Sequence, residues 1–140
     1  MKLFNLVAGT LLLLASCKNQ NQINLAMLNG YWEIEKIKTI DGNIKEYPYN
    51  EYVDFFSTEN NKGFRSKVKP LIGGKYQSNK KQIKYSIVQN NDSTFIQYDA
   101  FKGKWKDYVL SLTSSKLIVV NKQGTTYFYK PYKPIIIDEK

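Results

Sequence analysis

The sequence predicts an all-β protein, an antiparallel up-and-down β-barrel of about eight or nine short strands after one short N-terminal helical turn. Three observations predict it. Apolar and polar residues alternate over short segments, and turn residues recur about every eight to twelve positions. The 140-residue chain is long enough for one core and holds eleven tyrosines, which favour strands. A flat sheet of this size would leave two edges and a bare apolar face, so we favour a closed barrel over a two-sheet sandwich.

Residues 1–16 have the layout of a signal peptide. Met1-Lys2 is a basic start, Leu3 to Leu14 is an apolar run, and Ala15-Ser16 are small residues before the single cysteine, Cys17. The run is too short to span a bilayer, which takes about 20 residues. We therefore interpret it as a cleaved leader.

The segment Leu14-Ala15-Ser16-Cys17 resembles the lipobox of bacterial lipoproteins. The resemblance implies that Cys17 is the lipidated N-terminus of the mature protein and that residues 17–24 are a tether. Since Lys18 follows rather than aspartate, resemblance to the known sorting rule implies an outer-membrane location, anchored by lipid and facing the periplasm or the cell surface. The alternative is a free cysteine beside an ordinary cleavage site.

The first strand is predicted from Tyr31 to Ile40. Asn24 can cap a short helical turn before it, which Gly30 ends. The apolar residues of the strand change phase before Ile37, which predicts a bulge or sharp bend.

Turn signals separate the strands that follow. Asp41-Gly42 is a strong hairpin signal. Pro70 and Gly73-Gly74 are expected to interrupt pairing. The remaining strands are predicted near residues 51–56, 64–69, 75–77, 83–88, 94–101, 105–113, 117–120 and 125–130.

Several motifs between Leu28 and Tyr132 resemble the small lipocalin-like domain lipoproteins of Bacteroidota. In lipocalins an arginine lies across the tryptophan at the closed end of the barrel. The resemblance therefore implies closed-end packing of Gly30, Trp32 and Lys130, with lysine in place of arginine. The motifs are Leu28-Asn29-Gly30-Tyr31-Trp32, Asp41-Gly42, Tyr52-Val53-Asp54-Phe55, Gly63-Phe64, Gly73-Gly74-Lys75-Tyr76 and Tyr127-Phe128-Tyr129-Lys130.

Nine side chains are expected to point into the barrel as candidate ligand-binding residues. Their tyrosines combine an apolar ring with one hydroxyl, which suits an amphipathic ligand. The alternative is that the rings simply fill a small barrel. The nine are Val53, Phe55, Phe64, Val68, Tyr76, Tyr85, Tyr98, Leu110 and Tyr129.

The net charge of +9 includes a basic run expected on outward positions and turns. Such residues keep a sheet soluble, or they contact lipid phosphates, acidic glycans or an acidic partner. Export argues against nucleic acid as a partner. The run comprises Arg65, Lys67, Lys69, Lys75, Lys80, Lys81 and Lys84.

No catalytic site, metal site or cofactor is expected. The chain has no histidine and one cysteine, which removes the usual general base and any zinc-type cluster. Asp54, Asp99 and Asp107 are the candidate acids, but the sequence places no two of them together.

Two functions remain open. In the first, a monomeric, lipid-anchored barrel (residues 25–133) binds or carries a small hydrophobic or amphipathic molecule. In the second, a side-chain-filled barrel is a non-enzymatic accessory protein that docks onto an envelope complex or glycan, through an aromatic patch around Tyr47, Tyr49 and Trp105. The tail, residues 134–140, holds Ile135 to Ile137, which either pack on the barrel or contact a partner.

Overall fold

The computed structural model describes residues 22–138. They form one 3-10 turn and ten strands. The elements are η1 (Leu25–Leu28), β1 (Gly30–Lys38), β2 (Ile44–Glu46), β3 (Val53–Glu59), β4 (Lys62–Leu71), β5 (Lys75–Ser78), β6 (Ile83–Gln89), β7 (Thr94–Ala100), β8 (Gly103–Leu112), β9 (Leu117–Asn121) and β10 (Thr126–Pro131).

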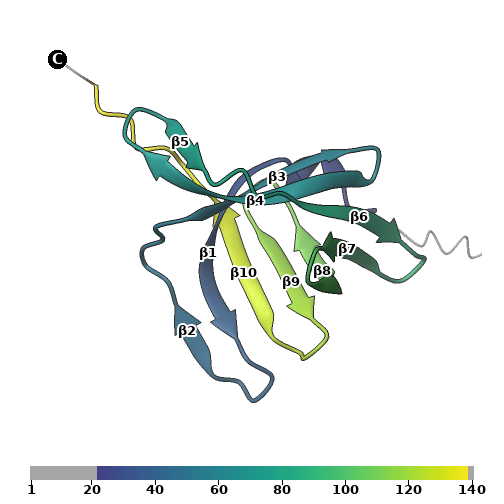
Figure 1. Ribbon diagram of the computed structural model, residues 1–140. Helices are drawn as coiled ribbons and strands as arrows, with labels where there is room; N and C mark the ends of the chain where they lie inside the picture. Colours follow the sequence, from purple (N-terminus) through teal and green to yellow (C-terminus); the bar gives the residue numbers. More distant parts are fainter. Residues whose placement is uncertain (1–21, 139–140) are drawn as a thin grey trace, which may run out of the picture.

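Eight of the strands close into an antiparallel barrel (Figure 1). Neighbours pair in the order β1, β3, β4, β6, β7, β8, β9 and β10, and β10 pairs back onto β1. β2 extends the sheet beside β1, and β5 pairs with β4 outside the closed ring. The predicted all-β, up-and-down barrel with one helical turn is confirmed.

The bend predicted in the first strand is also present. The pairing of β1 with β10 shifts register between Ile34 and Lys36. Such a bulge increases local twist, which helps β1 to pair with β3 through one half and with β2 through the other. Gly30 begins the strand at φ +123°, a conformation that favours glycine.

The prediction that Pro70 interrupts the strand is wrong. β4 continues through Pro70, which lies opposite Tyr76 of β5. The pairing of β4 with β3 extends no further along β4 than Val68, so Pro70 has a partner strand on one side only. A residue without an N–H is tolerated at such an edge position. The strand predicted near residues 75–77 exists as β5, but it is not a wall of the barrel.

The short strand β2 was not predicted. Its three residues, Ile44 to Glu46, are all exposed. A strand with no buried face shows no alternation of apolar and polar residues, which is the signal used to find strands.

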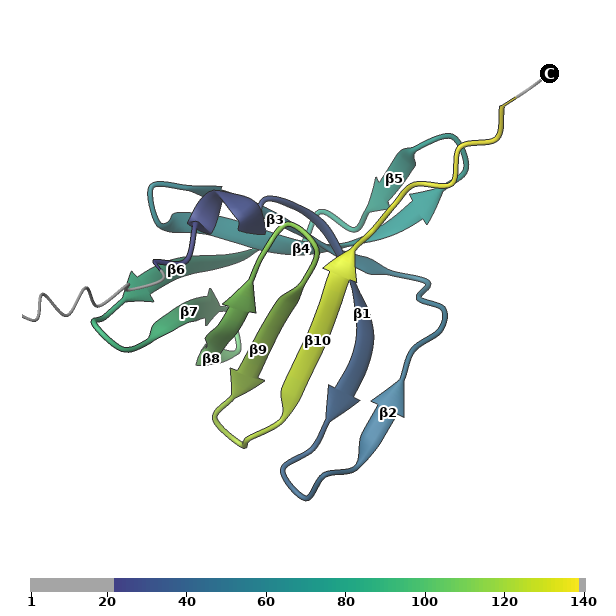
Figure 2. The ribbon, with the colours of Figure 1, turned by 180° about the vertical axis from the view of Figure 1, so that it is seen from behind.

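The short turn η1 covers one end of the barrel. η1, the purple turn in Figure 2, contacts β3 and β8. Trp32 is 3% exposed, and its Nε1 donates a hydrogen bond to the carbonyl oxygen of Leu28 at 2.8 Å. The buried core comprises Leu28, Trp32, Phe56, Tyr85, Ile87, Ile96, Tyr98, Val109, Leu112, Leu117, Val119 and Tyr129.

Within residues 22–138 no helix is long and apolar enough to cross a membrane. The expected signal peptide, Cys17 and the first part of the tether lie outside the described residues. The tail beyond β10 runs beside β5 in both views (Figures 1 and 2), and Ile135, Ile136 and Ile137 are exposed.

Candidate functional site

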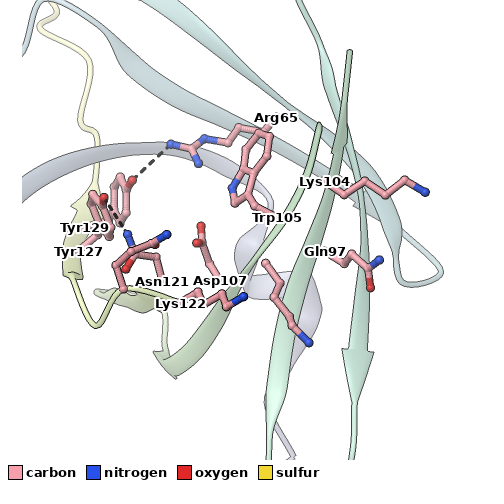
Figure 3. A pocket seen from close by; sticks show the side chains of 11 residues that line it. Arg65, Gln97, Lys104, Trp105, Asp107, Asn121, Lys122, Tyr127 and Tyr129 are labelled. Carbon is pink, nitrogen blue, oxygen red and sulfur yellow. Dashed lines mark hydrogen bonds between the residues drawn. The ribbon is translucent and has the colours of Figure 1, made fainter. Parts of the chain in front are cut away.

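A cavity of about 700 Å³ opens at the end of the barrel opposite η1. It lies between the first half of β8 and the turn that joins β9 to β10 (Figure 3). Its size is in the range of small-molecule sites, about 300–1,000 Å³. The lining residues are Arg65, Gln97, Lys104, Trp105, Lys106, Asp107, Asn121, Lys122, Gln123, Tyr127 and Tyr129.

Arg65 and Asp54 form an ion pair inside the barrel. Cross-strand neighbours share a face of the sheet, so Asp54 lies on the inner face with Trp32, which is opposite it. The Nε and Nη2 atoms of Arg65 each donate to the Asp54 carboxylate at 3.0 Å. The side chains are 17% and 3% exposed. Two parallel hydrogen bonds of this kind are the geometry that guanidinium groups favour, and buried charges need such a partner.

Two tyrosines complete the surroundings of the guanidinium. Arg65 Nη2 donates to the hydroxyl of Tyr129 at 3.3 Å, and Nη1 makes a longer contact with the hydroxyl of Tyr98 at 3.5 Å. The guanidinium also lies 5.4 Å from the ring centre of Phe56 and 5.7 Å from that of Tyr98. These contacts fix the direction of Arg65 across the floor of the cavity.

Burial and charge set the protonation of this floor. Burial raises the pKa of Tyr129 to about 12, an effect that the charge of Arg65 partly offsets. Burial likewise raises the pKa of Tyr98. Burial alone would lower the pKa of Arg65, but Asp54 keeps it well above its ordinary value. At neutral pH the floor therefore holds one cation and two neutral hydroxyl groups.

Asp107 points into the same space from β8 (Figure 3). It lies opposite Ile96 and Asn121 on the inner face and is 7% exposed. No other side chain or backbone group among residues 22–138 makes a hydrogen bond or ion pair with its carboxylate. Burial raises the pKa of Asp107, and the charge of Arg65 opposes that change.

Aromatic rings form the wall above Asp107. Trp105, which is 41% exposed, stacks on Tyr98 with ring centres 4.9 Å apart. The hydroxyl of Tyr127 lies 3.4 Å from the Nδ2 of Asn121. The cavity thus combines apolar ring faces with a polar floor, the mixture found in sites for amphipathic molecules.

Five of the nine expected inward residues are buried, three of them in the core cluster, and the other four are not buried. Tyr85, Tyr98 and Tyr129 are buried in the core, and Tyr129 also lines the cavity. Val53 and Val68 are buried opposite each other but outside the core cluster.

The other four side chains lie on the outer wall. Leu110 is 60% exposed and borders a second hollow, of about 780 Å³, near η1. Phe55, Phe64 and Tyr76 join an outer aromatic cluster, which consists of Tyr31, Phe55, Phe64, Tyr76 and Tyr132. Within it, Tyr31 stacks on Tyr76 with ring centres 3.9 Å apart.

The error on β3 has a physical reason. Val53, Phe55 and Phe56 offer apolar residues on both faces of the strand, so alternation does not decide which face turns inward. The inner face is the one that carries Asp54, because that carboxylate neutralises Arg65 across the β3–β4 pair.

Two predictions about basic residues are also corrected. Lys130 does not cover Trp32, since it lies opposite Glu33 on the outer face, with its Nζ 3.5 Å from the Glu33 carboxylate. Arg65 is not an outward charge. Lys67, which is 57% exposed, also contacts Asp54 at 3.2 Å, and Lys69 pairs with Glu51 at 2.9 Å.

Tyr129 is the one lining residue that was among the nine expected ligand-binding residues, so the two charged residues of the floor, Arg65 and Asp107, were not assigned to the cavity. One signal for Arg65 was present, because it is the single arginine of the sequence among many lysines. Arginine is favoured over lysine for buried, bidentate ion pairs. Asp107 was noted only as a candidate acid.

The three candidate acids do not form a catalytic pair. Asp54 is occupied by Arg65 and Lys67, and Asp99 is exposed opposite Lys104. Asp107 lines the cavity. In the described part of the chain, no cluster of three or more histidine, cysteine, aspartate or glutamate residues could hold a metal ion.

The model of one protein family, the lipocalin-like domain, matches residues 28–119. Among solved structures, the chain is similar to a lipocalin-like protein from Bacteroides uniformis, with 15% identity, a TM-score of 0.48, and coverage of 76% of this chain and 99% of that one. It is also similar to an uncharacterized protein from Bacteroides eggerthii, with 15% identity, a TM-score of 0.47, and coverage of 75% and 99%. No curated protein matches the chain significantly.

Proposed function

The chain belongs to the lipocalin-like domain family, and from this we propose that its barrel binds a small amphipathic molecule at its open end. A lipocalin-like barrel is a ligand-binding type of domain, and the family is generally non-enzymatic. The observation that carries the proposal is the cavity of about 700 Å³, with Trp105 and Tyr127 on its wall and Arg65 and Asp107 at its floor.

The ligand lies with its apolar body against the rings and its polar end toward the floor. Filling the cavity removes the exposed ring faces from water, which contributes about 25 cal/mol per Å² of apolar surface. The polar groups of the floor then select for orientation and chemistry.

An uncharged fluorescent probe, N-phenyl-1-naphthylamine, tests this function. We expect saturable binding to the wild-type protein and a loss of about 5- to 30-fold in affinity in Trp105→Ala, from about 1–2 kcal/mol of lost ring contact. Leu110→Ala is the matched control on the same strand, because Leu110 faces outward and borders the second hollow. Absence of saturable binding, or a larger loss in Leu110→Ala, would contradict binding at the open end.

The proposal includes a lipid anchor at Cys17. After cleavage before Cys17, a diacylglyceryl thioether and an amide-linked chain would hold the barrel at the outer membrane; two acyl signals are sufficient for stable anchoring. We expect radioactive palmitate to label the wild-type protein and not Cys17→Ser. A labelled Cys17→Ser protein that stays in the membrane pellet would refute the anchor.

A second candidate function rests on the outer aromatic cluster. Five half-buried rings on the outer wall, close to the exposed isoleucines of the tail, suit docking onto an envelope protein or glycan. Crosslinking in cells distinguishes the two functions. Docking predicts that a photoreactive residue at Ile136 captures a specific envelope partner and that one at Trp105 does not.

A further inference from the structure

We propose that Asp107 is the recognition group for a protonated amine, so the cavity takes amphipathic amines in preference to fatty acids or other carboxylates. This inference rests on the proposed function and specifies its ligand class.

The carboxylate of Asp107 can accept hydrogen bonds that no described residue donates. An ionised carboxylate has two oxygens and about four lone-pair sites. Asp107 is 7% exposed, and no group among residues 22–138 donates a hydrogen bond to it. Its oxygens border the cavity rather than a packed interior, since no buried side-chain oxygen of the described chain is left without a partner. A ligand in the cavity therefore meets an available acceptor.

The guanidinium of Arg65 on the floor already has an anionic partner. Arg65 gives its Nε and Nη2 donors to Asp54 at 3.0 Å, and Nη2 also reaches Tyr129. An incoming carboxylate would find neither the guanidinium fork nor an unpaired cation there. It would instead approach the negative charge of Asp107, and like charges in a poorly solvated site repel each other.

The lysines that border the cavity do not reverse this balance. Lys104 and Lys106 alternate with Trp105 and Asp107 on β8, so their side chains lie on the outer face. Figure 3 shows Lys104 pointing away from Asp107. The Nζ of Lys106 lies 4.7 Å from the ring centre of Phe95, on the outer wall. Lys122 is exposed at the rim, where solvent and salt screen its charge.

The walls suit the rest of such a ligand. Trp105 and Tyr127 offer ring faces, which bind apolar groups and also attract cations. Arg65 has five N–H donors and uses four of them in its contacts with Asp54, Tyr98 and Tyr129, so one donor on Nη1 is left. A hydroxyl or carbonyl oxygen near the amine could accept from it.

Burial of the Asp107 carboxylate destabilises the protein, and a bound amine would offset this loss of stability. A buried carboxylate without a donor destabilises the fold, and burial raises the pKa of Asp107 for this reason. Within the described chain the charge of Arg65 attracts this carboxylate, but no group donates a hydrogen bond to it. A cationic ligand would satisfy it.

Three probes with the same body and different head groups test the inference: 4-phenylbutylamine, 4-phenylbutanol and 4-phenylbutyrate. Calorimetric titration at pH 7.5 should give the amine the tightest binding, at least tenfold tighter than the carboxylate. Asp107→Asn keeps the shape of the side chain and removes its charge. It should weaken the amine by about tenfold or more, which is the loss of one charge-assisted hydrogen bond, and change the alcohol by less than threefold.

Asp99→Asn is the matched control, since it removes the same charge from the outer face of the neighbouring strand. It should leave all three affinities unchanged. The inference is overturned if the amine and the carboxylate bind equally well, or if Asp107→Asn leaves the affinity for the amine unchanged. In either case, binding of the alcohol leaves the proposed function standing. If none of the three probes binds, both the proposed function and the inference are rejected.

Discussion

Removing the carboxylate of Asp54 should cost the barrel much of its stability. In Asp54→Asn the guanidinium of Arg65, whose side chain is 17% exposed, loses both of its 3.0 Å hydrogen bonds to a charged partner. Removing one partner of a buried ion pair lowers the free energy of unfolding by about 3–5 kcal/mol, because the other charge remains buried without compensation. For a domain of this size each kcal/mol lowers Tm by about 4 °C, so we expect a drop of about 12–20 °C.

Urea unfolding followed by tryptophan fluorescence measures this loss as a change in midpoint at constant slope. Glu51→Gln is the control, because it breaks an exposed ion pair between Lys69 of β4 and Glu51, which precedes β3. The side chains of Glu51 and Lys69 are 54% and 42% exposed, so the loss should cost less than about 1 kcal/mol. The double variant Asp54→Asn, Arg65→Met should cost less than the sum of the single variants by about 1–3 kcal/mol. If Asp54→Asn is no more destabilising than Glu51→Gln, the interior ion pair does not organise the barrel as described.

Three further predictions concern stability. Gly63→Ala should destabilise by about 1–3 kcal/mol in urea, since an added Cβ would meet the backbone oxygen of Ser57; an unchanged midpoint would contradict the close approach of β3 and β4. Trp32→Phe should cost about 1–3 kcal/mol in the same assay, because a buried carbonyl of η1 loses its donor. Burial raises the pKa of Asp107 in the folded state, although the charge of Arg65 opposes the change. The wild-type protein therefore loses stability as the pH rises from the ordinary pKa of aspartate to the higher pKa of the folded state. Asp107→Asn should therefore have a higher Tm than the wild-type protein at pH 7, and this difference in Tm should shrink below the ordinary pKa of aspartate. A difference in Tm that grows on acidification would contradict this.

Turn chemistry was the reliable part of the prediction. Asp41-Gly42 joins β1 to β2, and Gly73-Gly74 joins β4 to β5. These turns depend on positive φ at glycine, a local property that a single sequence carries. The positions of most strands and their antiparallel order follow from such local signals, although β2 was missed.

The interior of the open end was not predictable from local patterns. Alternation identifies a buried face when one face is apolar, but the inner face of β3 and β4 carries Asp54, Arg65 and Lys67. Their position is decided by pairing across strands and by hydroxyls from β7 and β10. Contacts between such distant segments have no local signature, so Arg65 was expected on the surface and its pairing with Asp54 was not predicted.

The same limit applies to Asp107 and Trp105. Both lie in the first half of β8, where Lys104 and Lys106 flank Trp105. Two lysines in this position indicate an exposed basic segment. In the fold, closure of β10 onto β1 encloses the inner face of that segment. Trp105, which the docking hypothesis placed on an outer patch with Tyr47 and Tyr49, stacks instead on Tyr98 beside the cavity.

A crystal structure of the protein with 4-phenylbutylamine at pH 7.5 tests the central claim most directly. The account predicts density for the amine in the cavity at the open end, with its nitrogen about 3 Å from an Asp107 carboxylate oxygen and its phenyl ring against Trp105. Density in the hollow near η1, or a cavity closed by side chains with no ligand bound, would contradict it.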